Sequence, residues 1–329
     1  MKTPNKIIIS RTDAIGDVVL TLPMASLLKK TFPHCKIIFL GSAYTKDVVA
    51  CCSDVDEFIV FDEEKLNEIG ADTIVHVFPN KAIAAAAKKV GIKNRIGTSH
   101  RWYNWFMCNK LINVSRKKSD LHEAQLNLKL TACFDQVKDL YTYDDVLNLI
   151  NFEAKPTSTA NINLIDNDKF NLIIHPKSKG SAREWGLHNF RSLISLLPKD
   201  RFKIFICGTE QEGLAIRDAF ADAVQSGAAV DLTGTMSLSD YIYFISKADG
   251  LIAASTGPLH IAAALGRNAI GIYPPIRPMH PGRWACVGQK AKVFVADKEC
   301  NNCRKGGKCS CMEKVSPQDV RDYLMAIFR

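Results

Sequence analysis

The fold is decided near the start of the chain, where residues 6–17 read KIIISRTDAIGD. The isoleucines Ile7–Ile9 form an apolar run flanked by polar residues, which predicts a short buried strand. The next segment, Asp17–Lys30, has apolar residues at helical spacing, and a second apolar run follows at Lys36–Gly41. A strand, a helix and another strand in this order indicate a β-α-β unit, which implies a parallel sheet.

The alternation continues outward from this unit through both halves of the chain. The first half predicts strands at Lys6–Ser10, Lys36–Gly41, Glu57–Phe61, Thr73–Val77 and Asn94–Gly97, with helices at Asp17–Lys30, Tyr44–Cys52, Glu63–Ile69 and Lys81–Val90. The second half predicts strands at Asn171–His175, Lys203–Cys207, Val230–Leu232, Gly250–Ala253, Ala269–Tyr273 and Lys292–Val295, with helices at His188–Leu197, Glu210–Val224, Leu238–Lys247 and Pro258–Leu265. Between them, residues 98–150 favour loops and helices, and residues 151–168 are typical of a linker.

The sequence therefore predicts two doubly wound, Rossmann-like α/β domains, 1–155 and 156–329. We expect their sheets to face each other across a cleft at the carboxyl ends of the strands, with a donor in one half and an acceptor in the other. Ser316 followed by Pro317 predicts a last helix that runs to about Phe328. We expect that helix to pack back on the N-terminal domain.

Composition narrows the class of protein. The chain has 329 residues, 47% of them hydrophobic and 23% charged, which excludes long disorder and small disulfide scaffolds. The net charge of +9 fits either ordinary solubility or an anionic partner. No transmembrane or secretory segment is visible, so we expect a cytoplasmic protein with mostly free thiols. The glycine patterns of dinucleotide-binding and P-loop proteins are absent, which disfavours nicotinamide oxidoreductases and excludes P-loop NTPases.

Three loops that each join a predicted strand to a predicted helix carry candidate chemistry. In the first, Asp13 and Asp17 flank Gly16, and a carboxylate there can accept a proton from an incoming hydroxyl. The alternative role for Asp17 is that of a helix cap.

The second loop, His175–Trp185, reads HPKSKGSAREW. Its three cations, Lys177, Lys179 and Arg183, suit a diphosphate, whereas the alternative is a solvated basic loop.

The third loop leads into the segment Ala253–Gly266, where Thr256 and Gly257 precede a helix with Pro258 in its first turn. The free N–H groups and the positive end of the dipole at such a helix start suit an anionic leaving group. His260 lies on the same helix, and the alternative for it is a structural histidine.

Together these loops resemble the ADP-heptose:lipopolysaccharide heptosyltransferases, glycosyltransferase family 9. The resemblance covers nearly the whole chain. Its strongest parts are the Asp13–Asp17 loop with Leu22-Pro23, His175–Trp185, Ser255–His260 with Ala262–Gly266, and Leu121–Leu128. It implies a GT-B fold and an inverting transfer with no cofactor and no catalytic metal.

The resemblance also implies roles for individual residues. Asp17 matches the general base. The donor-binding residues that it implies are Lys177, Ser178, Lys179, Arg183, Glu210, Ser255, Thr256, Gly257 and His260. Arg183 stands where the family usually has Lys, and its guanidinium can still fork onto phosphate oxygens. Many members have Asp at the position of Ser255, and this difference leaves a different nucleotide sugar or acceptor glycan as an alternative.

The acceptor is expected on residues 98–125, which interleave cations with aromatics. The expected acceptor-binding residues are Asp13, Arg101, Arg116, Lys117, Lys118 and His122. The cations suit the anionic inner core of lipopolysaccharide, and the aromatics suit sugar faces or a lipid–water interface, with a peripheral contact at the cytoplasmic face of the inner membrane. The alternative is a buried aromatic cluster beside a solvated basic loop; nucleic acid is disfavoured.

The sequence leaves two further hypotheses open. Cys300, Cys303, Cys309 and Cys311 lie within twelve residues and form a zinc candidate, although their spacing is not a standard one and free thiols are the alternative. A nucleotide-sugar-binding protein without turnover is the alternative from a different class, and a base at position 17 distinguishes the enzyme from it.

Overall fold

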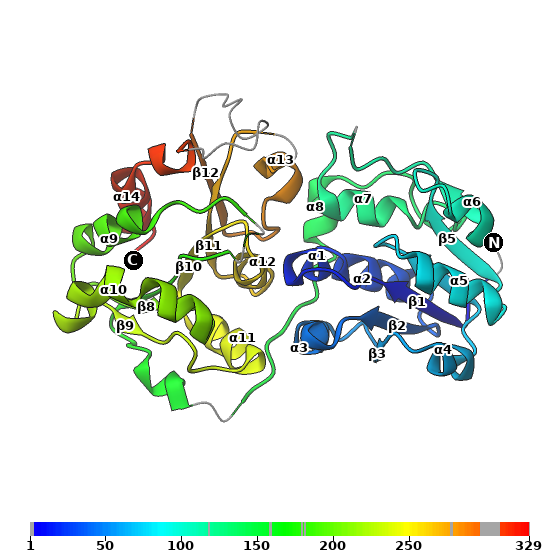
Figure 1. Ribbon diagram of the computed structural model, residues 1–329, viewed down its shortest axis with the longest axis horizontal. Coiled ribbons are helices and arrows are strands. Elements are labelled where there is room, and N and C mark those ends of the chain that lie inside the picture. The colour runs from blue at the N-terminus through cyan, green and yellow to red at the C-terminus, as the bar shows by residue number, and fades with distance from the viewer. Residues whose placement is uncertain are drawn as a thin grey trace. The chain divides into compact units, whose positions relative to one another are not determined.

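The computed structural model describes residues 3–117, 119–157, 160–178, 180, 182–276, 279–296 and 310–328. The chain divides into two compact units, Met1–Glu153 and Ala154–Arg329. Their boundary falls inside the expected linker, two residues before the expected position. Both units are α/β, with helices that flank a parallel sheet (Figure 1), which confirms the predicted fold class.

The described residues of the first unit form a six-stranded sheet in the order β3-β2-β1-β4-β5-β6, and the pairings are parallel. The strands are β1 (Lys6–Ser10), β2 (Lys36–Gly41), β3 (Glu57–Val60), β4 (Thr73–His76), β5 (Asn94–Thr98) and β6 (Lys110–Ile112). The helices are α1 (Ile15–Val19), α2 (Leu22–Thr31), α3 (Lys46–Val49), α4 (Glu63–Ile69), α5 (Lys81–Lys89), α6 (Asn104–Met107), α7 (Glu123–Lys129) and α8 (Tyr143–Leu147), with a 3-10 turn at Ala43–Thr45. The strand order reverses between β1 and β4, which is where open α/β sheets bind ligands.

The second unit repeats this topology, with the strand order β12-β11-β10-β7-β8-β9 over its described residues. The strands are β7 (Phe170–His175), β8 (Phe202–Ile206), β9 (Val230–Asp231), β10 (Gly250–Ala254), β11 (Asn268–Tyr273) and β12 (Ala291–Val295). The helices are α9 (Leu187–Leu196), α10 (Glu210–Gln225), α11 (Leu238–Lys247), α12 (Gly257–Ala264), α13 (Pro281–Trp284) and α14 (Pro317–Ile327), with 3-10 turns at Ala160–Leu164 and Met312–Lys314. Here the order reverses between β7 and β10.

Two elements of the first unit differ from the sequence expectation. The single helix expected over Asp17–Lys30 is two helices that meet at Leu20 and Thr21. Pro23 explains the break, because it has no N–H to continue the hydrogen-bond ladder of α1. The strand β6 was missed, because its three residues are too few to show a period.

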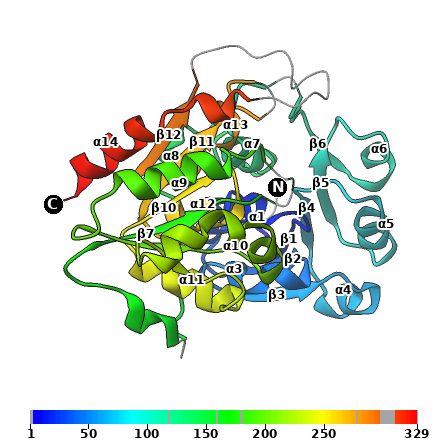
Figure 2. The ribbon, with the colours of Figure 1, turned by 60° about the vertical axis from the view of Figure 1, so that its left-hand side comes forward.

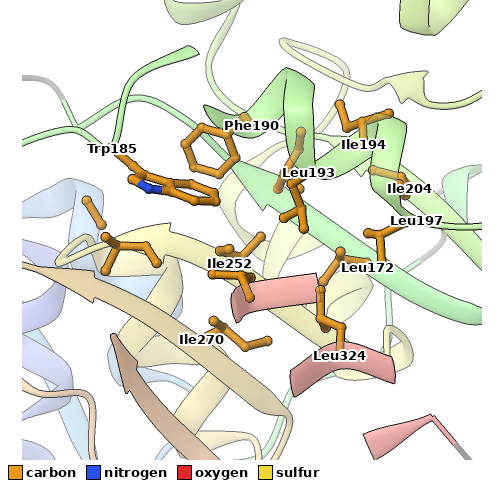
Figure 3. Packing of buried hydrophobic residues seen from close by; sticks show 14 of the residues in the cluster. Leu172, Trp185, Phe190, Leu193, Ile194, Leu197, Ile204, Ile252, Ile270 and Leu324 are labelled. Atoms are coloured by element: carbon orange, nitrogen blue, oxygen red, sulfur yellow. The ribbon is translucent and has the colours of Figure 1, made fainter. Parts of the chain in front are cut away.

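The C-terminal helix corrects another expectation. We expected α14 to pack on the N-terminal domain, but it belongs to the second unit and packs on α9 (Figure 2). Val320 and Leu324 enter the core beneath α9, where Trp185 and Phe190 also lie (Figure 3). The indole N–H of Trp185 donates to the carbonyl of Val315 at 2.9 Å. Burial of this apolar face, rather than any charge, therefore decides where the helix docks.

Candidate active site

The first unit places a cluster of charged side chains just after β1. Arg11 is the first residue beyond the strand and only 3% exposed. Its Nε donates to Asp13 Oδ1 at 2.6 Å, and its guanidinium also binds the carboxylate of Asp17. Its Nη1 donates to Glu123 Oε1 at 3.2 Å and to Asn127 Oδ1 at 3.3 Å. One buried guanidinium thus joins the loop after β1 to the distant helix α7.

The backbone around Arg11 explains why Asp17 faces this guanidinium. The N–H of Arg11 donates to Leu40 of β2 at 2.9 Å, which fixes the loop on the sheet. The N-cap residue of α1 is Ala14, and no side chain forms a capping hydrogen bond there. The carboxylate of Asp17 is therefore not used as a helix cap, which was the alternative, and it forms the ion pair with Arg11 instead.

Two side chains of α7 hold the two arginines of this site in place. Glu123 is fully buried, and its Oε1 also accepts from Arg116 Nε at 2.7 Å. Asn127, one turn further along, accepts from Arg116 Nη2 at 2.9 Å and donates to the carbonyl of Leu20 at 3.0 Å. That last bond satisfies the carbonyl of Leu20 at the break between α1 and α2. Glu123 and Asn127 were not predicted as site residues; their spacing of four on one helix face was the available signal.

Burial controls the protonation of this cluster. It raises the pKa of Asp17 to about 6, and the neighbouring Asp13 and Glu123 push in the same direction while Arg11 opposes them. Burial lowers the pKa of Arg11, but the surrounding carboxylates outweigh it and leave that pKa above its usual value. Arg11 therefore stays charged, whereas Asp17 is a carboxylate that is ionised at neutral pH and basic enough to take a proton.

The expected acceptor residues lie in different surroundings. Asp13 and Arg116 belong to the charge cluster described above. His122 is buried and caps α7, since its Nδ1 accepts from the N–H of Ala124 at 3.2 Å and its own N–H donates to Gln125. Arg101 and Lys117 are exposed, and Lys118 lies outside the described residues.

In the second unit, Glu184 organises the expected phosphate loop. Its carboxylate accepts from Lys177 Nζ at 2.6 Å and from the N–H and hydroxyl of Ser178 at 3.1 and 3.2 Å. The sequence expectation counted only cations here and missed this neutralising partner. Arg183 is half-buried and makes no ion pair within the part of the chain that the structure describes. Lys179 lies outside that part.

The helix α12 begins directly after β10, next to the point where the strand order reverses. Its N-cap is Thr256, whose side chain makes no capping bond. The hydroxyl Oγ1 of Thr256 is buried and has no hydrogen-bond partner among the described residues. Gly257 and Pro258 form the first turn, Ser255 is half-buried at the end of β10, and His260 is buried. An unpaired hydroxyl at the N-terminus of a helix is a ready donor for an anion.

Glu210 begins α10 and forms a two-pronged ion pair with Arg217, with distances of 2.8 and 3.0 Å. The hydrogen bonds from Arg217 lower the pKa of Glu210, so its carboxylate is ionised and acts only as an acceptor. A ribose hydroxyl can donate to it without displacing Arg217, because each carboxylate oxygen accepts more than one bond.

The structure describes only one of the four cysteines of the zinc candidate. Cys300, Cys303 and Cys309 lie outside the described residues, and Cys311 is buried in the core of the second unit. Within the described ranges no group of three or more His, Cys, Asp or Glu side chains has the geometry of a metal site. None of the described helices has the length and apolar character that crossing a membrane requires.

A groove of the first unit lies along the β3 edge of the sheet. It has a volume of about 650 Å³ and is lined by residues of the β2–β3 edge and α4, among them Lys36, Glu57 and Lys65. Its lining runs from Lys36 and Glu57, the first residues of β2 and β3, to Val60 at the end of β3, and it includes no residue of the Arg11–Asp17 loop.

Comparison with known proteins gives one consistent family. Residues 64–313 match the model of glycosyltransferase family 9 (heptosyltransferase). A Haemophilus influenzae protein that carries only the general name of a glycosyltransferase is 26% identical over 93% of this chain and 91% of its own length. Escherichia coli lipopolysaccharide heptosyltransferase 2 is 23% identical over 45% of this chain and 43% of its own.

Solved structures agree on the fold. The structure of E. coli ADP-heptose LPS heptosyltransferase II covers 98% of both chains with a TM-score of 0.79 at 17% identity. A family 9 glycosyltransferase from Veillonella parvula covers all of this chain and 98% of its own, with a TM-score of 0.77 at 18% identity. At these identities the likeness establishes the fold alone, which is the GT-B fold of the heptosyltransferases. Each unit contributes one parallel sheet flanked by helices.

Proposed function

The chain belongs to glycosyltransferase family 9, whose model is that of the heptosyltransferases, and from this premise we propose that it transfers a heptose from ADP-heptose to a hydroxyl of the lipopolysaccharide inner core. The chain is a glycosyltransferase; the donor and acceptor are the proposal. We assign the acceptor and the base to the first unit and the nucleotide sugar to the second. The names of the similar E. coli enzymes support this choice of donor.

The observation that carries the proposal is the pairing of Asp17 with Arg11 at the carboxyl end of β1. The carboxylate is fixed in position and has a pKa of about 6, raised chiefly by burial. A general base works best when its pKa lies near the operating pH. A protein that only bound the nucleotide sugar would have no use for such a group.

The proposed reaction is a single displacement with inversion. The oxygen of the acceptor hydroxyl forms a bond to the anomeric carbon of the donor, and Asp17 takes the hydroxyl proton. The bond between that carbon and the diphosphate oxygen breaks, and the electron pair leaves with ADP. Arg11 holds the carboxylate of Asp17 in place and stays charged throughout, so it orients the base without taking part in proton transfer.

The leaving diphosphate needs positive charge and N–H donors. In this proposal Arg183 and the start of α12 at Thr256 and Gly257 supply them, with Lys177 and Lys179 as further cations. Groups of this kind, fixed before the reaction, contribute roughly 3–4 kcal/mol each to the transition state. Glu210 would accept from a ribose hydroxyl of the nucleoside, and Ser178 and His260 would complete the donor site.

Ser255 favours one specific alternative, transfer from a different nucleotide sugar or to a different glycan. A serine hydroxyl is a neutral and weaker partner for sugar hydroxyls than a carboxylate.

A panel of nucleotide sugars tests the proposal, with released nucleoside diphosphate as the readout and a Kdo-containing lipid A as acceptor. We expect turnover with ADP-heptose that falls ~10²–10⁴-fold in Asp17→Asn, the range for loss of a general base, while donor affinity stays unchanged. Asp144→Asn, at an exposed aspartate of α8, is the matched control. Turnover only with another sugar would select the alternative, and full activity of Asp17→Asn would overturn the role of the base.

A further inference from the structure

The positive charge of this protein is concentrated in one stretch. Residues 73–119 hold ten of the 43 basic residues and none of the 34 acidic ones. The remaining 33 basic and 34 acidic residues nearly cancel, so this single stretch accounts for the whole net charge of +9. A charge that is segregated in this way creates a local field and attracts an anionic partner.

The fold gathers this stretch at one edge of the first sheet. Its residues 73–112, which hold seven of the ten cations, comprise β4, α5, β5, α6 and β6, the last three strands of the sheet order and the two helices between them. The helices α5 and α6 contact each other and α6 contacts β5, and both views show α5, β5 and α6 as neighbours (Figures 1 and 2). These seven cations therefore lie on neighbouring elements at one edge of the sheet, whereas Arg116 belongs to the charge cluster at Glu123.

Three large aromatic side chains are exposed within this region. Trp102, Trp105 and Phe106 are 68%, 62% and 66% exposed. We name them the aromatic patch. The alternative raised by the sequence, a buried aromatic cluster, is therefore wrong for these three residues. So much apolar surface gathered in five consecutive residues is unusual for a surface that meets only water.

The aromatic patch is built into the fold. The indole N–H of Trp105 donates to the carbonyl of Ser99 at 2.9 Å, and Lys88 Nζ donates to the carbonyl of Phe106 at 2.9 Å. Lys81 Nζ lies 5.2 Å from the centre of the Trp102 ring. The rings are thus held at the surface with ammonium groups beside them.

We propose that the aromatic patch, with Lys81, Lys88 and Arg101 around it, docks the first unit on an anionic phospholipid bilayer. Indole and phenyl rings partition into the boundary between headgroups and acyl chains, and lysine and arginine side chains bind the negative surface beside them. Because no acidic residue occurs in the stretch, nothing in its sequence repels the lipid phosphates.

Single-stranded nucleic acid also binds aromatics among cations, but the geometry favours lipid. Base stacking requires an open ring face. Lys81 covers one face of Trp102, and the ring of Tyr103 meets it edge-on at 5.9 Å. Insertion into an interface needs only exposed apolar side-chain surface, and all three residues are more than 60% exposed.

Vesicle binding of the full chain tests this inference without either substrate, so its failure is distinct from failure of the proposed function. We compare vesicles of phosphatidylcholine alone with vesicles that also contain phosphatidylglycerol. The protein should sediment with the anionic vesicles and not with the neutral ones. Lys81→Gln and Lys88→Gln should each weaken binding about fivefold. Lys65→Gln, at an exposed lysine of α4, should leave it unchanged.

The aromatic contribution is tested with Trp102→Ala and Phe106→Ala, which should each weaken binding about tenfold. Leu214→Ala is the matched control, because Leu214 is 71% exposed on α10 of the other unit. Tryptophan emission should shift to the blue on binding, and the shift should vanish in the Trp102→Phe, Trp105→Phe double variant. Equal binding to neutral vesicles, equal loss in Leu214→Ala, or displacement from vesicles by single-stranded RNA would each overturn the proposal.

Discussion

The guanidinium of Arg11 and the carboxylate of Glu123 are joined by a buried hydrogen bond of 3.2 Å, although 112 residues separate them in the chain. The bond ties the loop that carries Asp17 to α7, which carries the second arginine of the cluster, Arg116. Two guanidinium groups and three carboxylates thereby share one partly buried network. The position and basicity of the proposed base both depend on this network.

The first prediction concerns Glu123→Gln. The substitution keeps the shape but removes the charge between Arg11 and Arg116, and loss of one partner from a buried pair typically costs about 3–5 kcal/mol. Urea unfolding should show a loss near the lower end, because the amide oxygen can still accept a bond. Glu63→Gln, in the exposed pair with Lys89, should leave the midpoint unchanged. Similar midpoints for Glu123→Gln and the wild type would mean that the network does not stabilise the fold.

The second prediction is the pH dependence of the reaction. Asp17 must be ionised to take a proton, and its pKa is about 6. The value of kcat/KM should therefore rise with pH up to about 6 and level off above it. Because the charge of Glu123 raises the pKa of Asp17, the Glu123→Gln variant should reach its plateau at lower pH. If kcat/KM stayed constant between about pH 5 and about pH 8, the role of Asp17 as the base would be contradicted.

The third prediction links the base to stability. Since the folded-state pKa of Asp17 is raised from 3.8 to about 6, its contribution to stability is fully present below the unfolded value and is lost as pH rises through 6. Above pH 6 the free energy of unfolding of Asp17→Asn should therefore exceed that of the wild type by up to about 3 kcal/mol, at ~1.4 kcal/mol per pKa unit. Below pH 4 the two should coincide. A variant that is less stable than the wild type at pH 8 would show that the ion pair with Arg11 outweighs burial.

The fourth prediction separates the two described cations of the phosphate loop. Lys177 is paired with Glu184 at 2.6 Å, whereas Arg183 makes no ion pair within the described ranges. Arg183→Met should weaken ADP binding by about 10–100-fold, the range for a hydrogen bond to a charged group. Lys177→Met should weaken it only a few fold, because the affinity that its charge supplies is already reduced by Glu184. Calorimetric titration with ADP measures both, and a larger effect at Lys177 would refute the argument.

The strands were predictable because three or more apolar residues in a row, as at Ile7–Ile9, can only be buried. The position of Asp17 just after β1, in the first turn of α1, was predictable from the order of strand and helix, and it lies at the edge of the sheet where open α/β folds bind ligands. The link between Arg11 and Glu123 was not, since nothing local shows that two segments 112 residues apart will share a buried ion pair.

Two of the wrong expectations concern features that depend on segments distant in the sequence. The helix break at Thr21 depends on Pro23 and on the amide of Asn127, which is contributed by α7. The docking of α14 on α9 depends on the apolar face that Trp185 and Phe190 leave to be covered. Both are tertiary effects. The neutralisation of Lys177 by Glu184 is different, because both residues lie in the same quoted loop and only the carboxylate was overlooked.

The last prediction uses the buried hydroxyl of Thr256. Its Oγ1 has no hydrogen-bond partner among the described residues, and an unsatisfied buried polar group costs about 1–3 kcal/mol. Thr256→Val removes that group at nearly constant volume, so the free protein should gain stability in urea unfolding. The same change should weaken ADP binding about tenfold, because the hydroxyl would bond to the diphosphate.

Opposite signs for the two effects distinguish a ligand-binding hydroxyl from a structural one. Thr209→Val provides the contrast, because the hydroxyl of Thr209 caps α10 by accepting from the N–H of Glu212 at 3.3 Å. Its loss should cost about 1 kcal/mol of stability. If Thr256→Val destabilised the free protein as Thr209→Val does, the hydroxyl of Thr256 would have a partner in the fold itself, and its assignment to the donor diphosphate would be withdrawn.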